Sequence, residues 1–450
     1  QKMEHSVHEN NSYPSPKRAW LTVGILLVAY VLSFVDRQIL NLLVEPIRRD
    51  LQISDTEMSL LMGLSFAIFY TVAGIPLGRI ADSKSRRGLI AGGVAVWSLM
   101  TAFCGLAQQY WHFIIGRIGV GAGEAALSPA AYSLIADSFA PNRRATAISV
   151  YAMGIYLGAG AAFLLGGIVV TWANARGAMV LPVFGEVRPW QLIFLVLGAA
   201  GLMFCLVLLA IKEPTRKGIG AGVAVPLKDV AKYLVGIRKA VLCHNFGFAC
   251  LSFASYGASA WIPTFFIRNH GLTAGEVGIY YGSLVMVAGS LGIVFGGRLA
   301  DFLAQRGCLD ANMRVGLLSA ILTLLCNVVY LVDNMPLLWT IMFFNVFTVA
   351  MPFGVAPAAI QEIMPNAMRG QASAIYLFTI TLIGLGIGPT AVALFTDYVF
   401  QDDMAVRYSI FIVASVITVG SIILLAMGLK PYREARDTLT RWGEQQGQPG

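Results

Sequence analysis

Charged residues are scarce in this chain. They make up 12% of its 450 residues, whereas 57% are hydrophobic, and a soluble protein carries about 25% charged residues. The apolar residues come in long blocks that can cross the roughly 30 Å hydrocarbon core of a bilayer. This composition excludes an ordinary soluble protein and predicts one that crosses a membrane many times.

Several motifs that would carry enzyme chemistry are also missing. The six cysteines form no CxxC pair, the five histidines are not clustered within the membrane, and there is no HExxH motif. We therefore predict no disulfide framework and no metal site. There is no GxxxxGK[ST] phosphate-binding loop either. We expect no enzymatic activity and no cofactor, so that any work the protein performs draws on a gradient.

The apolar blocks predict an all-α membrane protein with twelve transmembrane helices. The expected spans are 19–44, 57–80, 88–108, 111–137, 143–171, 190–211, 239–266, 274–298, 312–332, 336–363, 369–396 and 407–429. They divide the chain into an N-terminal tail (1–18), a six-helix domain (19–211), a linker (212–238), a second six-helix domain (239–429) and a C-terminal tail (430–450). The linker sequence PLKDVAKYLVGI is compatible with an amphipathic helix on the membrane surface.

The distribution of lysine and arginine predicts the orientation. Twenty-four of the 32 lie at the termini or in loops that follow even-numbered spans, and six lie in loops that follow odd-numbered spans. The positive-inside rule then places both termini and the linker in the cytoplasm. We expect a multi-pass protein of the inner cell membrane. Its net charge of +8 reflects this asymmetry rather than binding to nucleic acid.

Two pairs of similar loops indicate an internal repeat. GRIADSKSRRG (78–88) follows the second span and GRLADFLAQRG (297–307) follows the eighth; PNRRATAIS (141–149) follows the fourth and PNAMRGQASAI (365–375) follows the tenth. Two six-helix halves of the same hand therefore face each other, which is the plan of a transporter that binds its substrate between the halves.

The repeated loops also predict a gate at the cytoplasmic face. An aspartate at a helix C-terminus is unfavourable against the helix dipole, so it needs cationic partners. We expect Arg86 or Arg87 to meet Asp82, and Arg306 to meet Asp301. The gate would close one state and separate in the other, although a static loop remains the alternative. The predicted gating residues are Gly78, Asp82, Arg86, Arg87, Asp137, Asp301, Arg306 and Glu362.

Four charged residues lie deep inside predicted spans, away from the span ends. Asp36 and Arg37 are adjacent in the first span, and Arg117 and Glu124 are seven residues apart in the fourth, on nearly the same helix face. Charges in hydrocarbon are costly, so we expect the four to neutralise one another in a polar cavity. The glycines of GRIGVGAGE (116–124) are expected to let the first span approach the fourth.

This cluster predicts proton coupling. A buried carboxylate has a raised proton affinity, and a nearby arginine opposes that rise. If an anionic substrate recruits Arg37, the acid that Arg37 had neutralised is free to bind a proton. Asp36 and Glu124 are the predicted protonation sites, and a structural ion-pair lock is the alternative. The predicted substrate-binding residues are Arg37, Arg117, Tyr30, Tyr132, Tyr156 and Tyr376, since tyrosine suits an amphiphile.

The twice-used GRxAD loop resembles the signature of the major facilitator superfamily over essentially the whole chain. Within it, FVDRQ in the first span, and the stretch from GAGEAALSPAAY to AAFLLGG across the fourth and fifth, resemble the spinster family. We take the chain for a bacterial homologue. Animal members of that family export sphingosine 1-phosphate or lysophospholipids. The resemblance assigns the family's Asp-Arg pair to Asp36 and Arg37, and its fourth-span charges to Arg117 and Glu124.

The resulting expectation is a monomeric, proton-coupled transporter that works by alternating access among membrane lipids. Its substrate would be an anionic amphiphile such as a lysolipid or a sphingolipid phosphate. Bacterial organic-anion:proton symporters carry similar charge pairs, but they usually continue GEA with proline, whereas this chain reads GEAALSP. A proton-coupled symporter of small organic anions such as sugar acids is the alternative.

Overall fold

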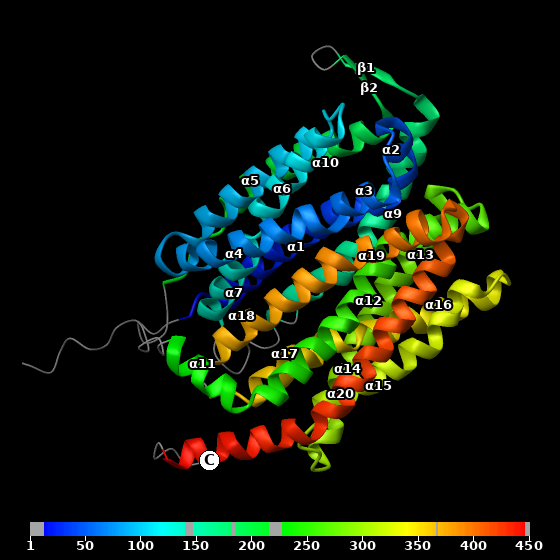
Figure 1. The fold of residues 1–450 in the computed structure, drawn as a ribbon. Coiled ribbons are helices and arrows are strands. Elements are labelled where there is room, and N and C mark those ends of the chain that lie inside the picture. The colour runs from blue at the N-terminus through cyan, green and yellow to red at the C-terminus, as the bar shows by residue number, and fades with distance from the viewer. Residues whose placement is uncertain are drawn as a thin grey trace, which may run out of the picture.

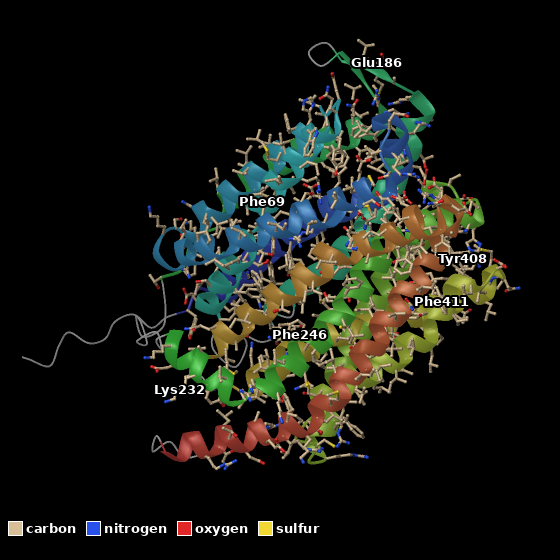
Figure 2. The ribbon with its side chains drawn as sticks, viewed as in Figure 1. Phe69, Glu186, Lys232, Phe246, Tyr408 and Phe411 are labelled. Carbon is tan, nitrogen blue, oxygen red and sulfur yellow. The ribbon has the colours of Figure 1, made fainter. Side chains whose placement is uncertain are left out.

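The computed structural model describes residues 13–139, 147–148, 150–181, 185–215, 227–365 and 368–445. Two groups of long helices, one from each half of the sequence, lie side by side (Figure 1). A short hairpin near Glu186 projects from one end of the bundle, and the helix that carries Lys232 lies at the other (Figure 2). We call these ends the hairpin face and the terminal face, because the helix at the C-terminus also ends at the latter.

The N-terminal half is built from helices with one two-stranded antiparallel hairpin, β1–β2. Its elements are α1 (Pro16–Leu42), α2 (Val44–Leu51), α3 (Asp55–Ser59), the π-helical η1 (Leu60–Leu64), α4 (Ser65–Ser83), α5 (Arg86–Cys104), α6 (Tyr110–Glu124), α7 (Leu127–Ser138), α9 (Gly154–Arg176), β1 (Met179–Leu181), β2 (Gly185–Val187) and α10 (Pro189–Leu208).

The C-terminal half follows helix α11 (Leu227–Gly236), which lies within the expected linker. Its elements are α12 (Arg238–His270), α13 (Ala274–Leu284), η2 (Val285–Gly289), α14 (Ser290–Gln305), α15 (Ala311–Cys326), η3 (Asn327–Leu331), α16 (Met335–Ala350), α17 (Pro352–Glu362), α18 (Arg369–Ile380), η5 (Thr381–Ile387), α19 (Gly388–Leu394), η6 (Phe395–Phe400), η7 (Asp403–Ala405) and α20 (Val406–Gln445). The repeated GRxAD motifs form the C-terminal turns of corresponding helices, α4 and α14.

Within the described residues, eleven continuous helical stretches are long and apolar enough to cross a membrane. The expected fourth span is interrupted, since α6 ends at Glu124 and α7 begins at Leu127. Pro129 explains the break, because it has no N–H to offer the carbonyl of Ala125 one turn earlier. The α6–α7 pair therefore supplies the remaining crossing, and the prediction of an all-α protein with two six-helix halves is confirmed.

The expected start of the fifth span, at 143, lies outside the described residues. At the other end of the chain, α20 continues beyond the expected boundary at 429 to Gln445. The continuation packs on the C-terminal half, because Tyr432 is buried and donates a hydrogen bond to Glu362 (2.7 Å) while Arg433 pairs with Asp310 (2.9 Å).

The halves meet where glycines allow backbones to touch. A Cβ added at Gly278 in α13 would collide with the carbonyl oxygen of Phe163 in α9, and one at Gly63 in η1 with the carbonyl oxygen of Leu385 in η5. These contacts join the halves on two sides, α9 with α13 and η1 with η5. The space left between them holds the functional residues.

Candidate functional site

The four intramembrane charges meet between α1 and α6. Arg37 Nε lies 2.6 Å from Glu124 Oε2, and Arg117 Nη1 lies 3.6 Å from Asp36 Oδ1. Each helix thus contributes one acid and one base, and each pair joins the two helices. The sequence predicted that these residues would come together, but it left open which acid pairs with which base.

Hydrogen bonds from α1 itself, from α5 and to η1 hold the two pairs in place. Ser33 Oγ donates to the Glu124 carboxylate at 2.6 Å, and the Thr101 hydroxyl in α5 donates to Asp36. Arg117 Nε donates to the carbonyl oxygen of Leu61 at 3.1 Å. That carbonyl belongs to the π-helical segment η1, and single π turns in helices occur frequently at functional sites.

The cluster still has unused hydrogen-bonding capacity. Asp36 Oδ1, Arg117 Nη1 and Glu124 Oε1 are buried atoms without a hydrogen-bond partner among the described residues. The 3.6 Å separation between Arg117 and Asp36 is an ion pair too long for a hydrogen bond. Buried polar groups are normally satisfied, so this arrangement is suited to take up a proton or a ligand atom.

Arg37 is the charge that a ligand can reach most readily. Its side chain is 14% exposed, against 0% for Glu124 and 1% for Arg117. Its guanidinium lies over the rings of Phe34, Phe66 and Tyr70, at 5.0, 4.6 and 4.8 Å from their centroids. These cation–π contacts help to hold the fork in place while leaving its edge available for an anion.

Arg37 faces a cavity that continues into the C-terminal half. Arg37 and Arg117 line a small cavity together with Gln38 and Asn41 of α1 and Tyr256 of α12. A larger cavity adjoins it and shares Phe34, Gln38, Tyr256 and Ser259 among its lining residues. The two cavities therefore border one another between the halves.

A third cavity lies on the terminal-face side of the charge cluster. Helices α4 and α7 of one half and α18 of the other form its wall, which includes Tyr70, the ring against which Arg37 packs. Most of the remaining lining side chains are apolar: Ile75, Ala125, Pro129, Ala374, Ile375, Leu377 and Phe378. An apolar opening between the halves thus leads towards the charged site.

The predicted tyrosines divide into two groups. Tyr156 lines the large central cavity and Tyr132 lines the terminal-face cavity. Tyr30 instead stacks on Tyr151, with ring centroids 4.6 Å apart. Tyr376 is buried against His244 at 5.2 Å inside the C-terminal half. We therefore correct the placement of Tyr30 and Tyr376, whose rings pack against other helices and line none of the three cavities described above.

The glycines of α6 also serve a different contact from the one expected. A Cβ at Gly116 or Gly119 would meet Cys104 or Met100 of α5, and one at Gly121 would meet the backbone of Phe66 in α4. They bring α6 close to α5 and α4 rather than to α1. The charged side chains, being long, bridge the wider separation between α1 and α6.

A network at the hairpin face joins the halves. Arg268 of α12 pairs with Glu45 (2.6 Å) and Asp55 (2.7 Å) of the N-terminal half, and Arg48 of α2 pairs with Asp55 and with Asp403 (both 2.9 Å). We call these five residues the hairpin-face lock. Sequence analysis missed the lock, although its arginines are among the few cations in loops that follow odd-numbered spans.

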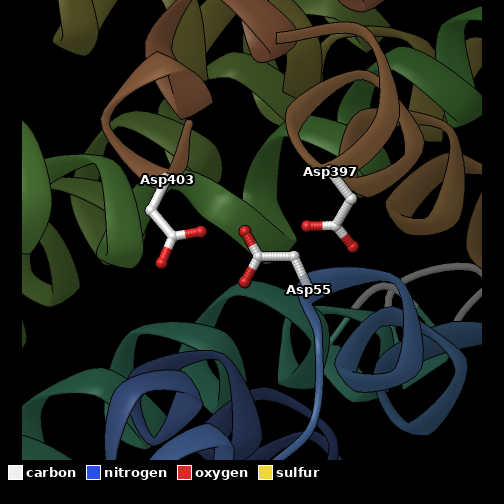
Figure 3. Close-up of side chains that lie close together, drawn as sticks. All are labelled: Asp55, Asp397 and Asp403. Atoms are coloured by element: carbon white, nitrogen blue, oxygen red, sulfur yellow. The ribbon is translucent and has the colours of Figure 1, made fainter. Parts of the chain in front are cut away.

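Three carboxylates converge at this lock (Figure 3). Asp55, Asp397 and Asp403 have oxygen atoms within 4.8 Å of one another. Arginines already neutralise Asp55 and Asp403, and Asp397 accepts hydrogen bonds from the backbone N–H and the hydroxyl of Thr56, at 2.7 and 2.6 Å. These partners identify the group as a contact between the halves rather than a metal site.

The predicted gating residues of the N-terminal half bond within that half. Buried Arg86 pairs with Asp137 and, at 3.0 Å, with Glu213, while Arg87 donates to the carbonyl oxygen of Ile211. Burial raises the pKa of Glu213, but hydrogen bonds from Arg86 and Ser85 outweigh it and hold that pKa below its ordinary value. The side chain of Asp82 lies outside the described residues.

Other predicted gating contacts are not formed in this conformation. Arg306 does not meet Asp301; its guanidinium lies over Phe302, 4.1 Å from the ring centroid, and both charged side chains are exposed. Glu362 accepts hydrogen bonds from Asn312 and Tyr432 of its own half. A Cβ at Gly78 would meet open space, so no helix approaches closely there.

The contacts between the halves define the conformation. Side-chain hydrogen bonds and ion pairs join the halves at the hairpin face: those of the hairpin-face lock, Thr56 with Asp397, and Ser59 with Thr390. The protein is thus closed at that face, and the cavity system extends towards the terminal face.

Comparison with known proteins agrees with this geometry. A model of the Major Facilitator Superfamily matches residues 26–389. An MFS-type efflux pump of Mycolicibacterium smegmatis is 32% identical over 415 residues, which cover 90% of this chain and 92% of the pump. The sphingosine-1-phosphate transporter SPNS2 of Danio rerio is 21% identical over 95% of this chain and 88% of its own length.

Among solved structures, a bacterial homologue of the human lysosomal transporter spinster, crystallised in an inward-facing and occupied conformation, superposes with a TM-score of 0.75. It is 23% identical, and the match covers 94% of this chain and 98% of that one. The shared fold, the match to the superfamily model and the identity to the efflux pump lead to one conclusion. The chain belongs to the major facilitator superfamily of membrane transporters, and its predicted resemblance to the spinster proteins is confirmed.

Proposed function

We propose that this transporter is proton-coupled and carries an anionic amphiphile by alternating access. The observation that carries the proposal is the 2.6 Å pair between Arg37, which borders the cavity, and Glu124, whose side chain is fully buried. An anion that binds Arg37 competes with Glu124 for the same guanidinium. Glu124 then remains in a low-dielectric site without its counter-ion, which favours its protonated form.

The second pair, Arg117 with Asp36, does not change when substrate binds. The negative charge of the substrate anion and the positive charge of the proton then cancel, so the cluster as a whole remains neutral. Asp36 is a further candidate protonation site, since its Oδ1 has no hydrogen-bond partner. Arg37 supplies a planar fork for a phosphate or carboxylate, a geometry that lysine cannot reproduce.

The amphiphilic nature of the substrate is inferred from the terminal-face cavity. Its wall is mainly apolar, it lies between α4 and α18 of opposite halves, and it reaches Tyr70 beside Arg37. An anionic headgroup at Arg37 can therefore place a hydrocarbon chain there. Because the positive-inside rule favours a cytoplasmic terminal face, we assign this conformation to the inward-facing state, with gating at that face by the loops after α4 and α14.

The test is transport by the purified full-length protein in sealed liposomes under an imposed pH step. We expect saturable, pH-driven movement of a fluorescent lysophosphatidylglycerol, which carries a net negative charge, and none with Glu124→Gln. The matched control is Glu186→Gln, which alters an exposed acid in β2. If Glu124→Gln responds to the pH step as the native protein does, the charge cluster is a structural ion-pair lock. If gluconate is carried and the lysolipid is not, the substrate is a small organic anion.

A further inference from the structure

An uncharged polar site lies in the C-terminal half, across the cavity from the charge cluster. Asn345 of α16, Asn327 of η3 and Thr323 of α15 all line the large central cavity. No charged residue is among the lining residues of that cavity. The wall opposite Arg37 is therefore built to bind by hydrogen bonds rather than by charge.

The asparagines are oriented by their own hydrogen bonds. Asn345 Nδ2 donates to Asn327 Oδ1 at 3.2 Å, and Asn327 Nδ2 donates to Ser415 Oγ at 3.4 Å. Thr323 uses its hydroxyl proton to donate to Thr348 at 3.0 Å. These bonds fix the orientation of both carboxamides, and the Oδ1 atom of Asn345 accepts none of them.

The carboxamide oxygen of Asn345 has no hydrogen-bond partner among the described residues. The residue is 4% exposed, yet it borders the cavity. An acceptor oxygen at a cavity wall can take a hydrogen bond from a ligand, and that bond stabilises the complex. The free atom is an acceptor, so the ligand group that fits it is a hydrogen-bond donor.

Gln38 connects this site to the charge cluster. It follows Arg37 in α1 and lines both the small cavity around Arg37 and the large central cavity. Its Oε1 accepts from Asn41 Nδ2 at 2.7 Å, so its amide nitrogen is the atom left for the cavity. A ligand can therefore lie along α1 with its anion at Arg37 and a neighbouring polar group directed towards Asn345.

We propose that Asn345, supported by Asn327 and Thr323, binds a hydroxyl or primary ammonium group of the substrate and selects against analogues that lack such a donor. This proposal rests on the proposed function, because it assumes that the substrate's anion is held at Arg37. The selected molecule carries an anionic group and a hydrogen-bond donor together. A lysolipid headgroup and a polyhydroxylated acid both meet that description.

Equilibrium binding to the purified full-length protein in detergent tests the proposal. The first arm compares oleoyl lysophosphatidylethanolamine, whose ammonium has three N–H donors, with oleoyl lysophosphatidylcholine, whose methylated nitrogen has none. We expect the native protein to prefer the former by about tenfold, as one hydrogen bond to a charged group implies. Asn345→Leu should remove the preference, whereas Asn345→Asp, which keeps acceptor oxygens, should retain it.

A control on the same helix tests whether the effect is specific to Asn345. Phe344→Leu changes a side chain on the same helix that is more than half exposed, and it should leave the preference intact. If Asn345→Leu does not fold, Asn345→Ala carries the same prediction. An unchanged preference in the folded Asn345 variant, or no preference in the native protein, overturns the selectivity site.

A second arm applies if neither lysolipid binds, a result that would overturn the amphiphile proposal. Gluconate is then compared with hexanoate, which has the same carboxylate and chain length without hydroxyl groups. A preference for gluconate that Asn345→Leu abolishes supports the selectivity site with a small organic anion as substrate. Equal binding of the two acids by the native protein overturns it.

Discussion

The hairpin-face lock predicts how strongly one side chain holds this conformation. Arg268 is 6% exposed and makes two hydrogen bonds to Asp55, at 2.7 and 2.9 Å, and one to Glu45 at 2.6 Å. Replacing Arg268 with glutamine leaves the fully buried Asp55 with Arg48 as its single cationic partner, at 2.9 Å. The substitution weakens the closed state and leaves each half intact.

The size of the effect follows from these contacts. Breaking a buried ion pair costs about 3–5 kcal/mol, and we take about 3 kcal/mol because Arg48 still neutralises Asp55. That free energy shifts the equilibrium towards the state open at the hairpin face about a hundredfold. If the native protein populates that state at about 1%, Arg268→Gln raises it to about half.

Double electron–electron resonance measures this shift directly. Spin labels at Arg49 in α2 and Tyr398 in η6 report the distance between the halves at the hairpin face, in a background without the six native cysteines. The control is Arg407→Gln, which breaks a 2.8 Å ion pair to Asp333 at the same face but within one half. A longer-distance population should grow with Arg268→Gln alone; identical distributions for Arg268→Gln and the native protein would refute the reasoning.

Three further outcomes follow from the structure. Arg37→Lys should weaken binding of the anionic substrate at least tenfold, measured by equilibrium binding, because an ammonium lacks the planar fork. Arg86→Gln should lower the unfolding free energy by about 3 kcal/mol, because it breaks a buried ion pair, whereas Arg87→Gln should lower it by less than half as much; thermal unfolding in detergent distinguishes them. Gly278→Val should reduce transport by separating α13 from α9, while Gly24→Val, at a glycine with open space around it, should not.

The charge cluster could be predicted from the sequence because charge in hydrocarbon is costly and therefore informative. Asp36, Arg37, Arg117 and Glu124 stood out against an apolar background, and the structure brings all four together. Their pairing could not be predicted, since Glu124 is two helical turns from Arg117 and either arginine could have reached it. Which arginine pairs with Glu124 depends on how α1 is rotated about its axis relative to α6. Packing contacts far from the cluster set that rotation.

Neutral polar residues gave no comparable signal. Asn327 and Asn345 are separated by 18 positions in two apolar segments, and an asparagine in such a segment satisfies its amide equally well by packing against a neighbouring helix. Their importance becomes visible when the fold places both on one cavity wall. The same limit applies to Tyr30 and Tyr376, whose sequence context does not distinguish a cavity-lining ring from a packed one.

The hairpin-face lock was missed for a different reason. Arg48 and Arg268 were counted among the cations in loops that follow odd-numbered spans, where the positive-inside rule disfavours them. A cation at a disfavoured position indicates a nearby acidic partner, and both arginines pair with carboxylates. The acidic residues nearby, such as Asp55 and Asp403, completed a pattern that sequence analysis could have recognised.

Proton uptake on ligand binding tests the central claim most directly, namely that an anion at Arg37 frees Glu124 to bind a proton. Lysophosphatidylethanolamine is added to the full-length protein in weakly buffered detergent solution near neutral pH, and an indicator dye reports the pH. The account predicts that the native protein takes up about one proton for each ligand bound, and that Glu124→Gln binds ligand without taking up any. Binding by the native protein without proton uptake, or equal uptake by Glu124→Gln, would contradict it.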